Sequence, residues 1–271
     1  MRTSAAVRRS TRAVLGALLL GLCALLGACA ASAPERRDVV TASDETNAER
    51  RARLRLELAG AYFGRGQNST ALDEVKQAIS AKPDLAAAHN MRGLIYAAMN
   101  EPQLAEESFR RALQLNPRDS EAMHNYGWFL CQQRRYTEAD LQFQQVIALP
   151  NYRDSTRSLL SQGVCQARAN QLAAAERTLA RAYELDPGNP TTAINLSEVL
   201  YREGEFERAR FYVRRVNTSE DLVSAQTLWL ALRIERRLGQ STQVQAIASQ
   251  LRNRYPDAPE TLLYAKGQFD E

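Results

Sequence analysis

The sequence predicts an all-α fold, a right-handed superhelical solenoid of about six helix-turn-helix repeats with a short C-terminal capping helix. Prolines close stretches that each contain two apolar patterns of helical period, and the step from Pro83 to Pro117 is 34 residues. Small residues recur at the same step, from Gly93 to Gly127. A single unit of this size cannot bury its apolar face, so neighbouring units must stack. The 45% hydrophobic content of the 271 residues excludes a disordered chain.

Residues 1–28 are expected to form an export signal. A basic segment with Arg8, Arg9 and Arg12 precedes an apolar stretch over residues 13–26, which is shorter than the ~20 residues of a membrane-spanning helix but typical of a signal peptide. The run Leu26-Gly27-Ala28-Cys29 resembles the bacterial lipobox. That resemblance implies that Cys29 carries a lipid and begins the mature chain; the alternatives are an uncleaved anchor and cleavage without lipid. Ala30, in place of an aspartate, favours a location on the outer membrane, facing the periplasm.

The basic balance of the chain belongs to this signal. The formal net charge is +4, but residues 1–28 contain four arginines and no acidic residue, so the remainder has 31 basic and 31 acidic residues. A nucleic-acid partner is therefore not expected. Residues 29–47 comprise the lipidated N-terminus and a polar stretch without apolar periodicity. We expect them to act as a flexible tether with a mean reach of about 25 Å.

Residues 48–256 hold the six predicted repeats, and Thr46-Asn47-Ala48-Glu49 has the form of a capping box that starts the first helix. The landmarks of the second repeat are Gly93, Tyr96, Ala105, Phe109, Ala112 and Pro117. Their offsets resemble the tetratricopeptide (TPR) repeat, which implies two antiparallel helices per unit; the sixth repeat is degenerate. Two surplus residues fall in 148–153, between the third and fourth repeats. Residues 257–271 are expected to hold the capping helix and a tail.

A narrower resemblance follows from the third and fourth repeats. The residues that carry it are Asn125-Tyr126-Gly127-Trp128-Phe129-Leu130-Cys131, Arg135-Tyr136, Glu138-Ala139, Pro150-Asn151-Tyr152 and Gly163-Val164-Cys165. They resemble the type IV pilus biogenesis lipoproteins of the PilF/PilW family, which are TPR pilotins. The resemblance implies an outer-membrane adaptor that binds the type IV pilus secretin and promotes its membrane targeting and multimerisation, hence pilus biogenesis and twitching motility. The alternative is a TPR lipoprotein scaffold for another envelope complex, in outer-membrane protein assembly or cell-wall hydrolase recruitment.

In TPR arrays the first helix of each pair lines the concave face. Counting along the first helices places the following residues in a partner-binding groove: Asn90, Leu94, His124, Asn125, Trp128, Leu160 and Val164. The two amides could clamp the backbone of an extended peptide, and Trp128 is a side chain of the kind that anchors interfaces. The alternative for Trp128 is an aromatic residue that only packs between repeats.

The sequence offers no enzymatic motif. It lacks a nucleophile elbow, a Gly-rich phosphate loop and a metal-ligand cluster, and neither His89 nor His124 has a carboxylate or cysteine at ligand spacing. We therefore expect no enzyme activity, no cofactor, no metal and no small-molecule substrate.

Cys131 and Cys165 lie 34 residues apart, in the first helices of the third and fourth repeats. An oxidising periplasm allows two thiols to persist as a disulfide. Successive first helices pack side by side in this architecture, which is compatible with the usual Cα separation of about 5.5 Å. The sequence predicts a structural bridge, because no C-x-x-C spacing indicates redox exchange. Two buried free thiols that act as small apolar residues are the alternative.

Overall fold

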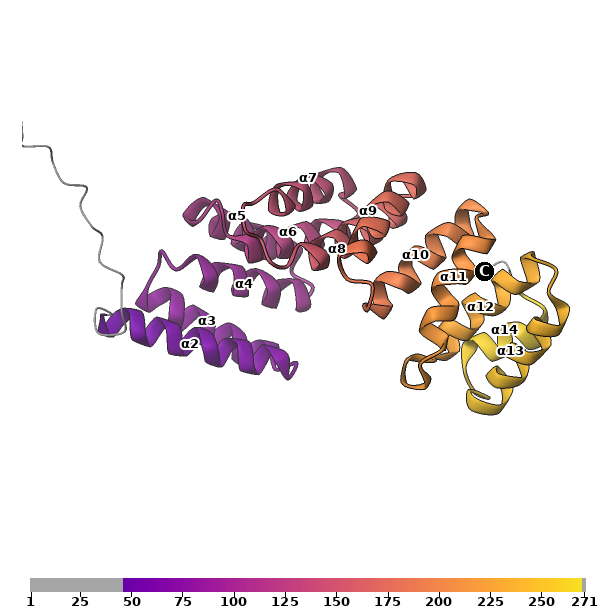
Figure 1. Ribbon diagram of the computed structural model, residues 1–271. Helices are drawn as coiled ribbons and strands as arrows, with labels where there is room; N and C mark the ends of the chain where they lie inside the picture. The colour runs from indigo at the N-terminus through magenta and orange to yellow at the C-terminus, as the bar shows by residue number, and fades with distance from the viewer. Residues whose placement is uncertain (1–45, 270–271) are drawn as a thin grey trace, which may run out of the picture. The chain divides into compact units, whose positions relative to one another are not determined.

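The computed structural model describes residues 46–269, and within that range the chain forms helices joined by short turns (Figure 1). The helix pairs are α2 (Asn47–Gly64) with α3 (Asn68–Ala81), α4 (Ala86–Ala98) with α5 (Pro102–Leu115), α6 (Ser120–Gln132) with α7 (Tyr136–Ile147), α8 (Ser155–Arg168) with α9 (Leu172–Leu185), α10 (Pro190–Glu203) with α11 (Phe206–Asn217), and α12 (Ala225–Arg237) with α13 (Ser241–Arg254). A short 3-10 helix, η2 (Glu220–Leu222), precedes α12, and α14 (Pro259–Lys266) ends the array. None of the described helices has the length and apolarity needed to span a bilayer. The predicted signal, the tether up to residue 45 and Cys29 lie outside the described residues.

In the second, third and fourth repeats a glycine on the first helix lets the two helices of the pair approach closely. A Cβ atom added at Gly93 would lie 2.8 Å from the ring of Phe109 on α5, and one added at Gly163 would lie 2.5 Å from Cγ of Leu179 on α9. Real Cβ atoms do not make contacts this short, so these two positions admit only glycine at the observed helix separation. Phe109 and Leu179 are fully buried, so these contacts lie in the core of the second and fourth repeats.

The turn within each pair contains one residue in the left-handed conformation. These residues are Gly66, Asn100, Arg134, Asn170, Gly204 and Gly239, with φ between 60° and 85°. Glycine and asparagine tolerate this conformation better than other residues do, which explains five of the six choices. The steps between them are 34, 34, 36, 34 and 35 residues, so the turn residue gives a common register for all six repeats.

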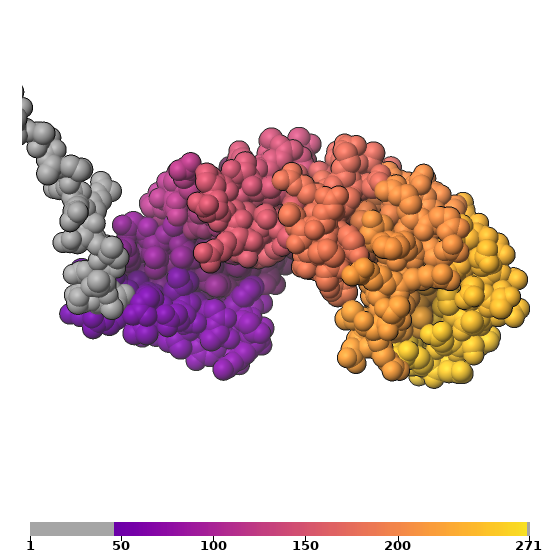
Figure 2. Space-filling model, in the orientation of Figure 1, coloured from indigo at the N-terminus to yellow at the C-terminus, as the bar shows by residue number. Residues whose placement is uncertain are grey.

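Successive pairs stack in chain order, and the second helix of one pair packs against the first helix of the next, as in α3 with α4 and α7 with α8. Consecutive first helices, from α2 to α12, also contact one another, whereas consecutive second helices do not make comparable contacts within residues 46–269. The first helices therefore form the inner side of the stack. The space-filling view shows the same neighbour-to-neighbour order along the surface (Figure 2).

Two junctions between repeats are longer than the others. Most pairs are joined by four residues, as at 82–85 and 116–119, but 148–154 and 218–224 have seven. The first long junction contains the two surplus residues that the spacing predicts, and Asn151 adopts a left-handed conformation there (φ 61°). The second long junction, which contains η2, was not anticipated from the sequence. The fifth repeat has no closing proline, and the longer connection stands in that place.

The C-terminal helix covers the end of the array, as expected for a cap. α14 packs against α12 and α13, and the residue that caps its C-terminal end, Gly267, has a positive φ of 71°. Beyond it, the ring of Phe269 stacks on Trp229 of α12. The guanidinium of Arg236, also on α12, lies 4.1 Å from the centroid of the Phe269 ring. The apolar face of the sixth repeat is thereby covered although no seventh repeat follows in the described residues.

The helix-pair contact predicts opposite effects of the same substitution at two glycines. Gly93→Ala forces the Phe109 ring out of its position and is expected to lower the free energy of unfolding by about 1–3 kcal/mol. Gly60→Ala, a control in the interior of α2, meets only Met91 Cε at 3.7 Å, so its higher helix propensity is expected to raise stability by up to about 1 kcal/mol. Urea unfolding followed by circular dichroism measures both changes. Equal effects at the two sites would contradict the account of the contact.

Candidate protein-interaction face

An apolar row runs across the first helices of the second, third and fourth repeats. Leu94, Trp128 and Val164 each lie six residues before the left-handed turn residue of their repeat, on α4, α6 and α8. All three are half-buried, and Leu94 and Trp128 pack against the core that contains Phe109 and Phe143. We call Leu94, Trp128 and Val164 the apolar row. Leu94 and Trp128 thus combine contact with the core and a partly exposed outer surface, which is the arrangement of an interface anchor.

Trp128 is held from both sides. Its indole contacts the core of the third repeat, and the guanidinium of Arg168, at the end of α8, lies 5.1 Å from the ring centroid. A cation over an aromatic face contributes roughly 0.5–1 kcal/mol at a partly exposed site. Trp128 therefore both packs between repeats and presents surface. Leu160, also placed in the groove by the sequence, is half-buried and packs against the core of the fourth and fifth repeats.

The two amides expected to clamp a peptide are engaged with each other instead. Asn125 Nδ2 donates to Asn90 Oδ1 over 3.3 Å, and Arg157 donates to Asn125 Oδ1 over 3.5 Å. Both asparagines are buried, with 9% of their surface exposed. The structure thus corrects the expectation that Asn90 and Asn125 line a groove, since these amides tie α4 to α6 and α6 to α8. The reason is that neighbouring first helices approach closely enough to bury the polar positions between them.

His124 is also a packing residue and not a groove residue. It is 5% exposed, its Nδ1 lies 2.8 Å from Ser158 Oγ, and that hydroxyl is 2.7 Å from the Tyr152 hydroxyl. Burial, reinforced by the positive charge of Arg157, lowers the pKa of His124 to about 4. The imidazole is therefore neutral at pH 7. It joins α6 to α8 and to the long 148–154 junction.

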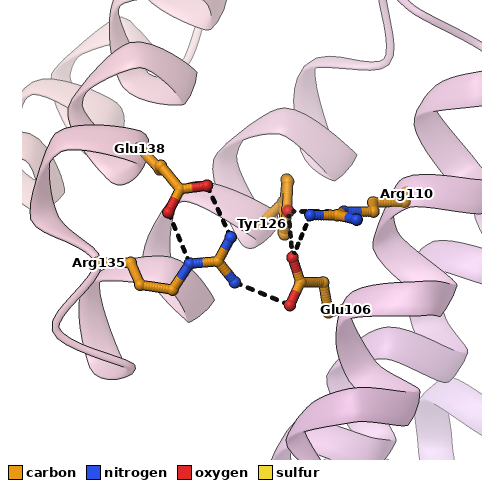
Figure 3. A network of polar contacts seen from close by, with 5 residues as sticks. All are labelled: Glu106, Arg110, Tyr126, Arg135 and Glu138. Atoms are coloured by element: carbon orange, nitrogen blue, oxygen red, sulfur yellow. Dashed lines mark hydrogen bonds and ion pairs between the residues drawn. The ribbon is translucent and has the colours of Figure 1, made fainter.

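A polar network holds the third repeat against the second (Figure 3). Glu106 of α5 accepts from the Tyr126 hydroxyl at 3.0 Å and from Arg135 at 2.8 Å, and it pairs with Arg110 at 2.7 Å. Arg135 also donates two hydrogen bonds to Glu138, at 2.7 and 2.6 Å. Tyr126 lies on α6, as does Trp128, so the network fastens the helix that carries the indole to α5.

The charges of this network are mutually stabilised. Burial by itself would raise the pKa of Glu106, but hydrogen bonds from Arg135 and Tyr126 outweigh it and leave the pKa below its ordinary value. The bonds to Glu138 and Glu106 raise the pKa of Arg135. The network was not predicted from the sequence, although Tyr126, Arg135 and Glu138 are among the residues that carry the family resemblance. Their spacing gives no signal of contact with Glu106, which lies 20 and more residues earlier in the chain.

Cys131 of α6 and Cys165 of α8 are joined in a disulfide, with Cα atoms 5.8 Å apart, which is the pairing that the sequence predicts. Both are buried, at 1% and 2% exposure. Cys165 follows Val164 directly, and Cys131 lies three residues after Trp128. The bridge therefore fixes the distance between two members of the apolar row.

Comparison with known proteins agrees with this architecture. Tetratricopeptide repeat family models match residues 86–119, 108–140, 130–190 and 166–222. The chain is 26% identical over 205 residues to the type IV pilus assembly protein PilF of Pseudomonas aeruginosa, covering 76% of this chain and 81% of that protein. The crystal structure of PilW, a type IV pilus biogenesis factor, superposes with a TM-score of 0.74 and 26% identity, covering 79% of this chain and 98% of PilW. The chain is a PilF/PilW-like TPR protein.

A solved structure of Pseudomonas aeruginosa PilF supports the same fold. It superposes with a TM-score of 0.70 at 24% identity, covering 82% of this chain and all of that one. Within residues 46–269 of this PilF/PilW-like protein, no three His, Cys, Asp or Glu side chains come together as metal ligands. His89, the second histidine considered from the sequence, is buried with its Nε2 2.9 Å from the Pro83 carbonyl oxygen.

The disulfide predicts a thiol count. In a chain lacking residues 1–29, Cys131 and Cys165 are the remaining cysteines. Labelling after denaturation without reductant is expected to find no thiols, and two after reduction. Replacing both cysteines by alanine is expected to lower the free energy of unfolding by roughly 3–4 kcal/mol, because the bridge closes a loop of 34 residues in the unfolded chain. Two reactive thiols in the unreduced protein would contradict the bridge.

His124 predicts a pH dependence of stability. Its pKa is about 4 when folded and near 6.5 when unfolded. The unfolded chain therefore binds a proton first, and stability is lost as the pH falls from about 6.5 towards 4. From pH 7 to pH 5 the free energy of unfolding of the unsubstituted protein is expected to fall by about 2 kcal/mol more than that of His124→Asn. Urea unfolding at both pH values measures the difference. The control variant, His89→Asn, is expected to keep the part of the pH dependence of stability that His124 causes. If His124→Asn had the same pH dependence as the unsubstituted protein, its cause would not be His124.

Proposed function

We propose that this protein is an outer-membrane lipoprotein adaptor that binds the type IV pilus secretin and promotes its membrane targeting and multimerisation. The similarity to PilF and PilW, whose names assign them to type IV pilus assembly and biogenesis, supports the pilus system as its setting. The observation that carries the proposal is the apolar row, a set of partly exposed side chains on the inner first helices. Repeats two to four supply this row and are the proposed secretin-binding part.

The row suits a segment of another protein better than a small molecule. Its members come one from each repeat and so are spaced by about one helix diameter, 8–10 Å, along the stack. An extended or helical segment reaches several such positions at once. Trp128 is the central anchor, because its indole offers a large rigid surface and a polar N–H group. The disulfide and the Glu106 network hold that surface in place before binding, which reduces the ordering cost of association.

The lipid anchor and tether complete the proposed adaptor. Acylated Cys29 would hold the protein in the outer membrane, and residues 30–47 would let the helical array reach partners about 25 Å away. Binding, positioning and release are the whole activity of such a protein. A non-enzymatic interaction role also fits the TPR architecture, which presents surfaces and brings no catalytic groups of its own.

Trp128→Ala tests the proposed face. It is expected to reduce co-purification of the secretin with the full-length lipoprotein by about tenfold or more, as loss of a central anchor does. Phe211→Ala is the matched control, since Phe211 is 58% exposed on the second helix α11, away from the row, and its loss is expected to leave co-purification unchanged. Circular dichroism and thiol counting verify the fold of both variants. Undiminished secretin recovery with Trp128→Ala would place the interface elsewhere.

Deletion of the gene separates the pilus role from a general envelope role. Fewer secretin multimers and lost twitching motility, with a normal porin profile, are the expected results. A collapse of porin assembly would instead indicate a scaffold in outer-membrane protein assembly.

A further inference from the structure

A second row on the first helices consists of arginines. Arg168, Arg202 and Arg237 each lie two residues before the left-handed turn residue of repeats four, five and six. All three are exposed, in the last turn of α8 and α10 and at the end of α12. Repeats two and three carry Ala98 and Gln132 at the same place. We call Arg168, Arg202 and Arg237 the arginine row.

None of the three forms an ion pair with a carboxylate of residues 46–269. Arg202 donates to the Ala167 carbonyl oxygen and to Asn170 Oδ1, both at 3.0 Å, at the C-terminal end of α8. Arg168 lies over Trp128, and Arg237 lies 5.0 Å from the Phe206 ring centroid. These contacts orient the guanidinium groups without neutralising them. Other arginines of the array, such as Arg135, Arg208 and Arg233, are paired with glutamates.

Arg202 and Arg237 share an open cleft of about 360 Å³ whose other walls include Tyr201, Phe206 and Arg233. Arg233 pairs with Glu198 at 2.9 Å and lies over the Tyr201 ring, so its charge is satisfied. Glu203 also lines the cleft, and burial together with the like charge of Glu176 raises its pKa. The cleft therefore combines two arginines that have no ion-pair partner among residues 46–269, one carboxyl group and aromatic walls.

We propose that the arginine row binds an extended acidic segment of a protein partner. Adjacent first helices lie about 8–10 Å apart. An extended chain in the polyproline II conformation rises about 3.1 Å per residue with three residues per turn, so every third side chain points to the same side. Carboxylates at every third residue of such a segment therefore match successive arginines, and each can accept two hydrogen bonds from a guanidinium. The inference goes beyond the secretin proposal and does not depend on it, because it concerns repeats four to six and a different chemistry.

A protein segment fits this row better than a membrane surface. The arginines lie on the first helices, and two of them line a cleft, so a narrow chain reaches all three. A flat lipid surface would engage exposed second helices more readily. The second helices also carry exposed arginines, such as Arg208, which pairs with Glu176, and Arg177.

The test uses the full-length lipoprotein in phosphatidylcholine nanodiscs and a fluorescent peptide of about twelve residues, with glutamate at every third position and serine between. Fluorescence anisotropy is expected to show binding that weakens with added salt. Replacing Arg168, Arg202 and Arg237 by glutamine is expected to weaken it about tenfold or more. The matched control replaces Arg111, Arg177 and Arg181, which are exposed on second helices, and is expected to retain binding.

A charge-reversed pair keeps the test independent of any loss of fold. Arginine-to-glutamate variants of the row are expected to bind the same peptide with lysine in place of glutamate. Equal loss in the row and control variants, or equal affinity for a peptide with its glutamates in one block, would overturn the proposal. Failure of the patterned peptide to bind would also overturn the proposal. If phenylglyoxal, which modifies accessible arginines, then modified the row less in phosphatidylglycerol nanodiscs only, the row would be a membrane contact.

Discussion

The close approach of the two helices in each repeat is the contact on which the rest of the molecule depends. Where Gly93 meets the Phe109 ring and Gly163 meets Leu179, no side chain separates the helices, so each pair forms a thin layer with large buried residues on the other helix. Thin layers stack with their first helices in contact, and this brings residues 34 to 36 positions apart side by side. Both rows on the first helices follow from that stacking, as does the disulfide.

The junction between the third and fourth repeats shows how the array absorbs an irregularity. Its longer connection places Tyr152 against Ser158 and, through that hydroxyl, against His124. The Cys131–Cys165 bond spans the same two first helices. A buried neutral imidazole, two hydroxyl groups and a covalent bond thus fasten the one place where the 34-residue step is broken by two. Trp128 packs against the cluster that contains both cysteines, so part of this stiffening adjoins the surface where a partner needs a fixed shape.

The sequence predicted the helices and their order because a 34-residue period constrains every repeat at once. It predicted the Cys131–Cys165 pairing because both cysteines lie on neighbouring first helices. It failed for Asn90, Asn125 and His124, since position on one helix does not determine exposure when the next helix covers that position. The Glu106 network was not predicted for a related reason: its members come from three helices and from the turn before α7, and their contacts depend on side-chain reach and not on spacing.

The chemistry of the first helices changes along the stack, and the contact between Trp128 and Arg168 lies where it changes. Six residues before each turn the chain places Leu94, Trp128 and Val164, and then Glu198 and Arg233, which neutralise each other. Two residues before each turn, uncompensated arginine begins only at the fourth repeat. Apolar contacts set affinity through buried area, whereas exposed charge sets orientation and association rate. A partner chain that lies along both rows therefore has a defined direction, with its apolar part at repeats two to four and its acidic part at repeats four to six.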